Sequence, residues 1–365
     1  MVDGSSGGAR PLQRGRGATA NPDGRFEAQR RVAEDDGWSG SDDDAPPALA
    51  TTLTPEKART IITRNDSPDI PFDVSINPYR GCEHGCIYCF ARPTHAYLGL
   101  SPGLDFESRL FFKPDAPALL DAELRRKSYV CEPIALGANT DPYQPAERRL
   151  EIARRVLEVL RDFEHPVFIV TKSALVQRDI DILAPMAEKR LAAVAISVTT
   201  LDRRLARRME PRAATPERRL ETIRALTGAG IPVTVLTSPM IPALNDHELE
   251  AILEEAAAAG AVSAGYVFLR LPHELKDLFR EWLETHAPGR ARHVLSLVAQ
   301  AHGGKAYDSE WGHRLRGAGP YAEALRLRFE LACKRLGLNR HGRMRGLDTS
   351  RFKPPPKPGD QLGLF

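Results

Sequence analysis

The chain has 365 residues, a formal net charge of +3 and a hydrophobic fraction of 42%. Its length permits one large domain or two ordinary ones, and the near-balanced charge gives no global electrostatic reason for binding nucleic acid. We expect no membrane segment, because no apolar run is long enough to span a bilayer and no apolar signal region begins the chain. Five cysteines in this length fit a reducing cytoplasm better than a disulfide framework.

Composition divides the chain into a central folded part and two polar ends. Residues 1–50 are rich in Gly, Ser, Asp, Ala and Arg, which is typical of a disordered tail. We expect the main domain over residues 51–287, a helical extension over 288–345 and a flexible tail over 346–365. Residues 334–357 contain eight Lys/Arg and one acid, so this stretch is either a solvated surface or a phosphate-binding one.

A cysteine-rich loop follows the first predicted strand. Cys82, Cys86 and Cys89 are spaced C-x3-C-x2-C and account for three of the five cysteines. Thiolates are natural ligands of an iron–sulfur cluster, and three ligands leave one iron of a [4Fe–4S] cube open to a small molecule. Gly81 and Gly85 let the backbone turn tightly around such a cube, because glycine accepts positive φ.

Two other interpretations of this loop compete with the cluster. A structural zinc ion needs a fourth Cys or His ligand, for which His84 and His95 are the candidates. A disulfide framework needs more cysteines in a shorter secreted chain. The remaining Cys131 and Cys333 are isolated, and we interpret them as ordinary buried thiols.

With the aromatic Tyr88 before its third cysteine, this motif resembles the cluster motif of the radical S-adenosylmethionine superfamily. The resemblance implies that Cys82, Cys86 and Cys89 hold a [4Fe–4S] cluster whose open iron binds S-adenosylmethionine. It further implies release of a 5′-deoxyadenosyl radical that abstracts hydrogen. Most of this chemistry belongs to the cofactors, while the protein positions them and shields the radical.

Strands and helices alternate after the cysteine loop. Apolar runs predict strands over residues 73–77, 133–137, 167–171, 192–198, 232–237 and 265–271. Helical spacing and capping residues predict helices over 115–127, 146–163, 178–189, 215–228, 245–260 and 274–286. Six strand–helix units favour an α/β fold with a parallel sheet covered by helices. The family resemblance implies that this sheet is a partial (β/α)6 TIM-like barrel with a helical C-terminal extension.

Small polar or charged residues follow the predicted strands, at the edge where parallel barrels place their chemistry. The resemblance makes six of these residues candidates for binding S-adenosylmethionine: Tyr88, Asn139, Thr140, Asp141, Lys172 and Ser197. Asp141 or exposed backbone carbonyls are expected to meet the amino group of the ligand, and Lys172 its carboxylate. The competing interpretation is that some of these residues only cap the helices that follow.

The arginine-rich stretch of residues 203–219 is ambiguous, because half of it fits the outer face of a helix. Within it we expect Glu210, Pro211 and Arg212 to face the mouth of the barrel, where an arginine can hold phosphate.

Over about residues 70–290 the chain looks most like the branch that contains spore photoproduct lyase, whose members are often labelled DNA repair photolyases. The matching features are the cysteine spacing, Thr140 with Asp141, Lys172 and Ser197. Two positions depart from that lyase. Ala138 stands where the lyase has a hydrogen-donating cysteine, and Phe90 stands where it has a tyrosine. The substrate therefore does not follow from the branch.

The resulting hypothesis is a cytoplasmic radical enzyme that acts on nucleic acid in DNA repair and takes its electron from an unidentified donor. Its rivals are modification of RNA or protein by the same radical, and a non-catalytic iron–sulfur module associated with DNA. The C-terminal residues Gln361–Phe365, which follow a proline-rich segment, resemble the bacterial sliding-clamp-binding pentapeptide except at Gly363. This motif predicts the sliding clamp as a partner.

Overall fold

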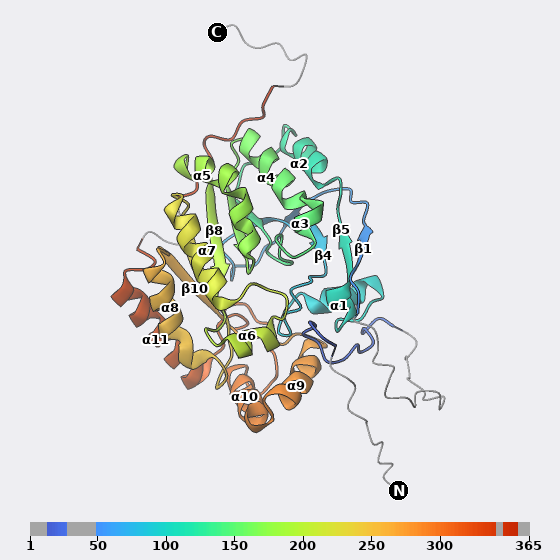
Figure 1. Ribbon diagram of the computed structural model, residues 1–365, viewed down its shortest axis with the longest axis vertical. Helices are drawn as coiled ribbons and strands as arrows, with labels where there is room; N and C mark the ends of the chain where they lie inside the picture. The colour runs from blue at the N-terminus through green and yellow to red at the C-terminus, as the bar shows by residue number, and fades with distance from the viewer. Residues whose placement is uncertain (1–12, 28–48, 341–345, 357–365) are drawn as a thin grey trace.

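In the computed structural model, residues 13–27, 49–340 and 346–356 are described. A seven-stranded sheet in the order β10-β9-β8-β7-β6-β3-β2 forms the centre of the molecule (Figure 1). The edge strand β2 (Ile62–Arg64) pairs antiparallel to β3. The remaining strands are mutually parallel: β3 (Val74–Ile76), β6 (Ile134–Leu136), β7 (Val167–Thr171), β8 (Ala192–Ser197), β9 (Val233–Met240) and β10 (Ser263–Phe268). This confirms the predicted fold class.

Helices cover the outer face of the parallel sheet. They are α2 (Ala116–Leu124), α4 (Ile152–Asp162), α5 (Ile180–Glu188), α7 (Pro216–Gly228) and α8 (Leu249–Ala258). α7 begins as the sequence predicts, because the Thr215 hydroxyl accepts a hydrogen bond from the Arg218 amide and Pro216 occupies the first turn. Each helix buries an apolar stripe against the strands, so the sheet is covered along its outer face.

Side chains alternate between the two faces of the parallel strands. Val167 and Ile169 of β7 point outward into the core shared with the helices. Phe168 points inward, where it packs with Ala193 and Ala195 of β8. Leu347, from the C-terminal segment, also contacts this inner cluster. The interior of the barrel is therefore filled at one end by a residue distant in sequence.

A second, three-stranded sheet lies beside the barrel and was not predicted. It consists of β1 (Thr52–Pro55), β5 (Arg109–Phe112) and β4 (Tyr79–Arg80). Between β4 and β5 the chain forms the 3-10 helix η1 (Arg92–Leu98) and the one-turn helix α1 (Asp105–Ser108). Residues 92–112, which follow the cysteines, thus form a compact cover for the cysteine loop. Its elements are short and pair across long sequence separations, so local patterns do not predict them.

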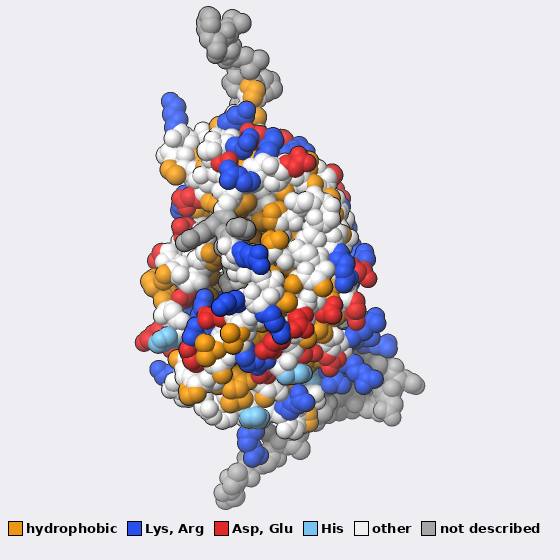
Figure 2. All heavy atoms as spheres, turned by 90° about the vertical axis from the view of Figure 1, so that its left-hand side faces the viewer, with side chains coloured by type: hydrophobic (Ala, Val, Ile, Leu, Met, Phe, Trp, Pro, Cys, Tyr) orange, Lys and Arg blue, Asp and Glu red, His pale blue; other side chains and the backbone are white. Residues whose placement is uncertain are grey.

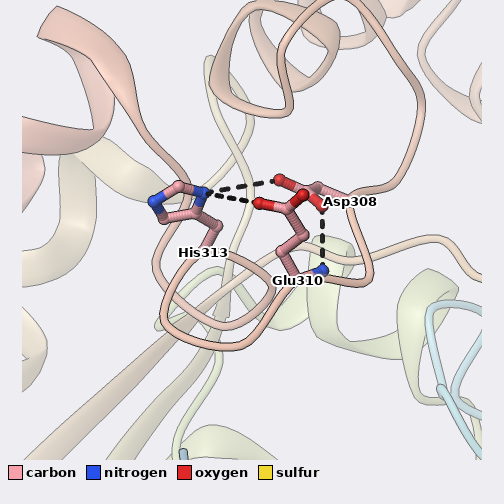
Figure 3. Close-up of side chains that lie close together, drawn as sticks. All are labelled: Asp308, Glu310 and His313. Carbon is pink, nitrogen blue, oxygen red and sulfur yellow. Dashed lines mark hydrogen bonds and ion pairs between the residues drawn. The ribbon is translucent and has the colours of Figure 1, made fainter.

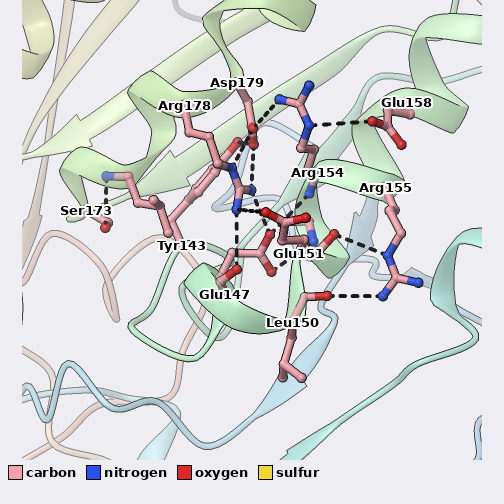
Figure 4. Close-up of polar contacts among 12 residues, drawn as sticks. Tyr143, Glu147, Leu150, Glu151, Arg154, Arg155, Glu158, Ser173, Arg178 and Asp179 are labelled. Carbon is pink, nitrogen blue, oxygen red and sulfur yellow. Dashed lines mark hydrogen bonds and ion pairs between the residues drawn. The ribbon is translucent and has the colours of Figure 1, made fainter.

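The helix predicted over residues 146–163 is broken. α3 (Glu147–Leu150) ends at Glu151, which adopts the left-handed conformation, and α4 begins at once. The buried Glu147 carboxylate causes the break, because it accepts hydrogen bonds from the amides of Ala153 and Arg154 in the first turn of α4. Figure 4 shows this carboxylate beside Arg178 and Asp179.

The remaining helices are η2 (Ala174–Asp179), α6 (Arg203–Met209), η3 (Asp246–Glu248), α9 (Leu275–His286), α10 (Pro288–Ala301) and α11 (Gly319–Leu336). Residues 302–318 lie between α10 and α11 without a helix. α11 packs beside α8 and is joined to it by Arg328–Glu250 and Arg335–Glu254 ion pairs. On the face of the molecule that includes these helices, acidic and basic side chains are interspersed rather than segregated (Figure 2).

Two segments of the predicted tails are ordered parts of the fold. Residues 13–27 lie against the cysteine loop and α1, and residues 346–356 lie across the opposite end of the barrel (Figure 1). Lys353 donates its amide to the carbonyl of Phe163, which precedes β7. The disordered tail expected over residues 1–50 and the flexible tail expected over 346–365 therefore both need correction in these segments. Composition misses them because their partners lie far away in sequence.

Candidate functional site

The cysteine loop leaves β4 at the carboxyl edge of the parallel sheet. Gly81 and Gly85 have φ values of 76° and 67°, which L side chains rarely adopt. Cys82 and Cys86 are buried and Cys89 is half-buried. Burial raises the pKa of Cys82 and of Cys86, and for Cys82 the nearby Asp141, Cys86 and Cys89 add to the rise. These thiols stay protonated unless a metal centre displaces the protons.

The fully buried Arg92 binds the backbone of the cysteine loop. Its guanidinium donates hydrogen bonds to the carbonyl oxygens of Cys86 (2.8 Å) and Gly85 (3.0 Å). It also forms a 2.6 Å ion pair with Glu107, whose side chain is equally buried. A buried arginine is tolerated because its charge is paired and its donors are satisfied. The shape of the loop therefore depends on an ion pair that the sequence analysis missed.

The competing zinc interpretation would take its fourth ligand from the second ring nitrogen of His84 or of His95. Nδ1 of His84 lies 3.2 Å from the Asp141 carboxylate, and Nε2 of His95 lies 2.9 Å from the Arg109 carbonyl. Zinc ligands about 2.3 Å from one ion place their sulfur atoms roughly 3.8 Å apart. The three cysteine sulfurs do not gather within 4.8 Å of one another. Among the described residues, the loop therefore holds no three-ligand set already gathered around a single ion.

Two of the predicted ligand residues are held by the protein itself. The Thr140 hydroxyl donates to the Tyr79 carbonyl at 2.8 Å. The Asp141 carboxylate accepts hydrogen bonds from the amides of Tyr143 and Lys172 and from the Thr171 hydroxyl, and it faces His84. Burial raises the pKa of Asp141, but His84 and these donors outweigh burial and lower it below the ordinary value. Asp141 thus links the cysteine loop to the end of β7.

A polar network beneath this loop fixes its position. The Tyr143 hydroxyl donates to Asp179 at 3.0 Å, and Arg178 bridges Asp179 and Glu147 (Figure 4). Glu147 also accepts a hydrogen bond from the hydroxyl of Tyr79 in β4. The segments after β4, β6 and β7 are therefore connected by buried carboxylates, which keeps their exposed residues in register.

The other residues at the barrel mouth differ in how far their polar atoms are already engaged. Lys172 has no ion pair with any described residue, and its ammonium lies 5.8 Å from the centre of the Tyr88 ring. Ser197 ends β8 and is buried. Ser238, at the end of β9, has a buried hydroxyl without a partner among the described residues. The amide of Asn139 donates to the Asn77 side chain at 2.9 Å.

The Tyr88 side chain points into a second buried network. Its hydroxyl contacts the Glu210 carboxylate, which also accepts from Thr199 at 2.7 Å and pairs with buried Arg219. Arg212 pairs with Glu83 of the cysteine loop at 3.2 Å. Glu210 and Arg212 therefore contact the cysteine loop, which agrees with their predicted position at the mouth.

A cleft of about 760 Å³ opens beside the cysteine loop. Both departures from the lyase pattern, Phe90 and Ala138, line it. Arg270 also lines the cleft, with its guanidinium 4.1 Å from the centre of the Phe90 ring. No carboxylate of the described residues pairs with Arg270, and burial lowers its pKa. The other charged and aromatic side chains at the wall are Asp66, Phe72, Tyr79, Arg80, Tyr97, Lys113, Trp311 and Arg314.

One further group has the composition of a metal site but not its environment. Asp308, Glu310 and His313 gather on the connection between α10 and α11 (Figure 3). Glu310 and His313 are exposed, and His313 pairs with both carboxylates at 3.6 and 3.8 Å. Solvated groups of this kind commonly pair without a metal ion, so we assign no site here.

Comparison with known proteins identifies the domain that carries the cysteine loop. Residues 76–256, just under half of the chain, match the family model of the Radical SAM superfamily, so this part of the chain is a radical SAM domain. Within it, the fold resembles spore photoproduct lyase. The solved lyase complexed with dinucleoside spore photoproduct matches 78% of this chain and 80% of its own, with a TM-score of 0.57 and 16% sequence identity.

Sequence relatives are described only as uncharacterized proteins. One from Mycobacterium tuberculosis is 39% identical over 221 residues, which are 60% of this chain and 65% of the relative. One from Acidianus two-tailed virus is 27% identical over 217 residues, covering 56% and 68% of the two chains. The chain thus spans just under two thirds of the mycobacterial relative. No helix among the described residues is long and apolar enough to cross a membrane.

The residues present fit the cofactors of this superfamily, a [4Fe–4S] cluster and S-adenosylmethionine. Cys82, Cys86 and Cys89 offer three thiols from one short loop. The Lys172 ammonium has no ion pair and the Ser238 hydroxyl no hydrogen-bond partner among the described residues, so both are open to a ligand. A solved lyase variant is described with bound S-adenosylmethionine and dinucleoside spore photoproduct.

Proposed function

We propose that this protein is a radical S-adenosylmethionine enzyme that acts on nucleic acid, in the context of DNA repair. When bound, the cluster and S-adenosylmethionine supply a 5′-deoxyadenosyl radical that abstracts a hydrogen atom from substrate. Cys82, Cys86 and Cys89 hold the cluster. We place the protein in the reducing cytoplasm, with an electron donor still to be identified.

For S-adenosylmethionine we propose the six residues predicted from the sequence, with distinct roles. Lys172 pairs with the carboxylate, since it lacks an ion pair with described residues. Ser197 binds the polar edge of the ligand together with Ser238, whose buried hydroxyl has no partner among the described residues. Tyr88 and Asn139 contribute backbone groups.

Thr140 and Asp141 act by holding the loops rather than by direct contact. A carboxylate has about four lone-pair sites. The three hydrogen bonds to Asp141 and its pairing with His84 occupy them. The Thr140 hydroxyl is likewise engaged. This arrangement favours a positioning role for both residues, and it leaves the amino group of the ligand to the open iron and to backbone carbonyls.

The single observation that supports a nucleic-acid substrate is the cleft beside the cysteine loop. Arg270 lies over Phe90 with no carboxylate partner among the described residues, and Arg80 and Lys113 lie in the same wall. Cations suit phosphate groups, and aromatic faces suit stacked bases. The structurally similar lyase was solved in complex with a dinucleoside spore photoproduct, which agrees with this substrate class.

The cleft also argues against simple dimer splitting by the lyase mechanism. Ala138 and Phe90 replace the cysteine and tyrosine of the lyase, and both line the cleft. Neither side chain has an S–H or O–H hydrogen to donate, so a substrate radical receives no hydrogen from these positions. We therefore propose a different product from the lyase's.

The test is anaerobic reconstitution followed by product analysis with ultraviolet-damaged DNA, intact DNA and RNA. We expect 5′-deoxyadenosine and a modified or repaired base with DNA, and loss of the product in Arg270→Ala. Conversion of RNA alone, or of protein alone, would replace the proposal with one of its rivals. Absence of any reductive cleavage of S-adenosylmethionine would favour the non-catalytic iron–sulfur module.

We also propose recruitment by the DNA sliding clamp through Gln361–Phe365. These residues lie outside the described part of the chain, and the proposal rests on their sequence. The described C-terminal segment supports it by its location. Residues 346–356 leave the barrel at the end opposite the cysteine loop, so a partner held there does not cover the cleft.

A further inference from the structure

Residues 13–27 of the N-terminal segment pack closely against the cysteine loop. Gly17 packs so tightly that a Cβ atom built there would lie 1.8 Å from the Gly85 carbonyl oxygen. Only glycine permits this contact, since the neighbour is backbone and cannot swing away. Ala18 lies in the apolar cluster that contains Cys86, Ile87 and Tyr88. The segment is therefore part of the wall around a cluster-binding cysteine.

Hydrogen bonds join this contact to the arginine that shapes the loop. The amides of Gly17 and Ala18 donate to the two carboxylate oxygens of Glu107 at 2.8 and 2.7 Å. Glu107 pairs with Arg92, which donates to the carbonyls of Gly85 and Cys86. Because Gly17 also contacts Gly85 directly, the contacts of Gly17, Glu107, Arg92 and Gly85 form a closed ring.

Further contacts hold the segment on both sides of Gly17. Arg16 donates to the carbonyls of Glu107 and Leu49, each at 2.6 Å. Asn21 exchanges two hydrogen bonds with Asp105, at 3.0 and 3.2 Å. Arg25 forms a 3.0 Å ion pair with Glu274. The segment is thus attached to η1 and α1 and to the start of α9, which lie on different sides of the loop.

We propose that residues 16–25 form a strap that keeps the cysteine loop in its cluster-binding shape and excludes solvent and oxygen from Cys86. Glu107 joins the strap to the cysteine loop, since its carboxylate binds both the strap amides and Arg92. This inference rests on the proposed cluster at the loop and not on the identity of the substrate. Without the strap, the Gly85 carbonyl loses the close contact of Gly17 and the apolar cluster around Cys86 loses Ala18.

The first test compares two glycine substitutions in the full-length protein. Gly17→Ala displaces the strap, whereas Gly289→Ala is a matched control, because a Cβ atom at Gly289 meets nothing within 4 Å. Hydrogen exchange is measured on the protein without cluster. We expect the amides of Cys82, Gly85 and Arg92 to exchange roughly tenfold faster or more in Gly17→Ala, with the strands of the barrel unchanged. Equal exchange in both variants would overturn the strap.

The second test measures protection of the cluster. After anaerobic reconstitution, iron release on exposure to air should be several-fold faster in Gly17→Ala and in Glu107→Gln than in wild type and Gly289→Ala. Release at the wild-type rate in both strap variants would refute shielding. Should no variant bind iron, the proposed cluster fails, while the exchange experiment still decides whether the strap holds the loop.

Discussion

Two fully buried arginines show how single residues shape the cysteine loop. Arg92 binds the carbonyls of Gly85 and Cys86 from one side, and Arg219 pairs with Glu210, which receives the Tyr88 hydroxyl on the other. Removing one member of a buried ion pair typically costs about 3–5 kcal/mol, because a charge is left unpaired. Both arginines are therefore structural supports of the motif.

Substitution of single cysteines tests the cluster. Anaerobically reconstituted wild type should hold about four irons per chain, and Cys86→Ala should lose the cluster because a ligand is missing. Cys333→Ala is the matched control, because it removes a buried thiol that lies in α11, away from the loop. This variant should keep its iron. Iron analysis and absorption spectroscopy measure both variants. Retention of the full cluster by Cys86→Ala would contradict the assignment.

Lys172→Gln tests the ligand carboxylate contact. A charge-assisted hydrogen bond contributes about 1.5–3 kcal/mol, so binding of S-adenosylmethionine should weaken roughly 10- to 150-fold. Anaerobic calorimetry on the reconstituted protein gives the affinity. Lys276→Gln, on the exposed face of α9, serves as the control. If the two variants bind S-adenosylmethionine equally well, Lys172 does not contact it.

At the scale of elements, the C-terminal segment acts as a latch across the amino ends of the strands. Phe352 packs against the rings of Tyr129, Phe163 and His165 at centroid distances of 5.4, 6.3 and 5.4 Å. Asp348 pairs with Arg190 just before β8. These contacts close the end of the barrel that the cofactors do not use.

His165 makes this latch sensitive to acid. Burial lowers its pKa from 6.5 to about 4, while its Nδ1 and Nε2 contact the Pro166 carbonyl and the Tyr129 hydroxyl. The folded state thus binds fewer protons than the unfolded state between these two pKa values. Stability is fully present above pH 6.5 and falls as the pH drops toward 4.

We expect protonation of His165 to lower the free energy of unfolding by about 3 kcal/mol as the pH falls from about 7 to about 4. Denaturant titrations of the cluster-free protein at both pH values measure the loss, and His165→Phe should show a loss smaller by that amount. His313→Gln removes an exposed histidine and should leave the wild-type loss unchanged. Identical pH dependence in wild type and His165→Phe would show that His165 is not buried in its neutral form.

At the scale of the molecule, the two ends of the barrel carry different features. The cleft is lined by Ala138 and Asn139, which follow β6 at the carboxyl edge of the strands, and the strap lies against the cysteine loop at the same edge. Residues 346–356 lie at the opposite end of the barrel (Figure 1). Under the recruitment proposal, a clamp bound beyond residue 356 leaves the cleft open to substrate.

Recruitment is tested with a peptide of residues 354–365 and with the full-length protein. We expect the peptide to bind the sliding clamp with micromolar affinity, about −8 kcal/mol, because Leu364 and Phe365 fill an apolar pocket. Leu364→Ala combined with Phe365→Ala should abolish binding and leave the cluster intact, whereas Lys357→Ala should not. Calorimetry decides, and full-length protein without measurable clamp binding would end the recruitment proposal.

Local sequence patterns were sufficient for the parallel sheet and for the three cysteines. β7 lies over residues 167–171 as predicted, and α7 begins at its predicted cap. Apolar runs, capping residues and C-x3-C-x2-C spacing act over a few neighbouring positions, so the sequence displays them directly. The sequence patterns did not predict the break in the helix at Glu151. The break arises because the Glu147 carboxylate caps α4 and also binds Arg178, which is distant in sequence.

Only the tertiary structure decided what surrounds the motif. Gly17 meets Glu107 across 90 residues and Tyr88 meets Glu210 across 122, and no periodicity links such pairs. The saturation of Asp141, the position of Arg270 over Phe90 and the strap depend on how the strand ends converge. By itself the sequence determined the chemistry of the loop, because ligands close in sequence suffice for a cluster. The strap that shields the loop and the cleft that opens beside it are formed by chain segments that meet only after folding.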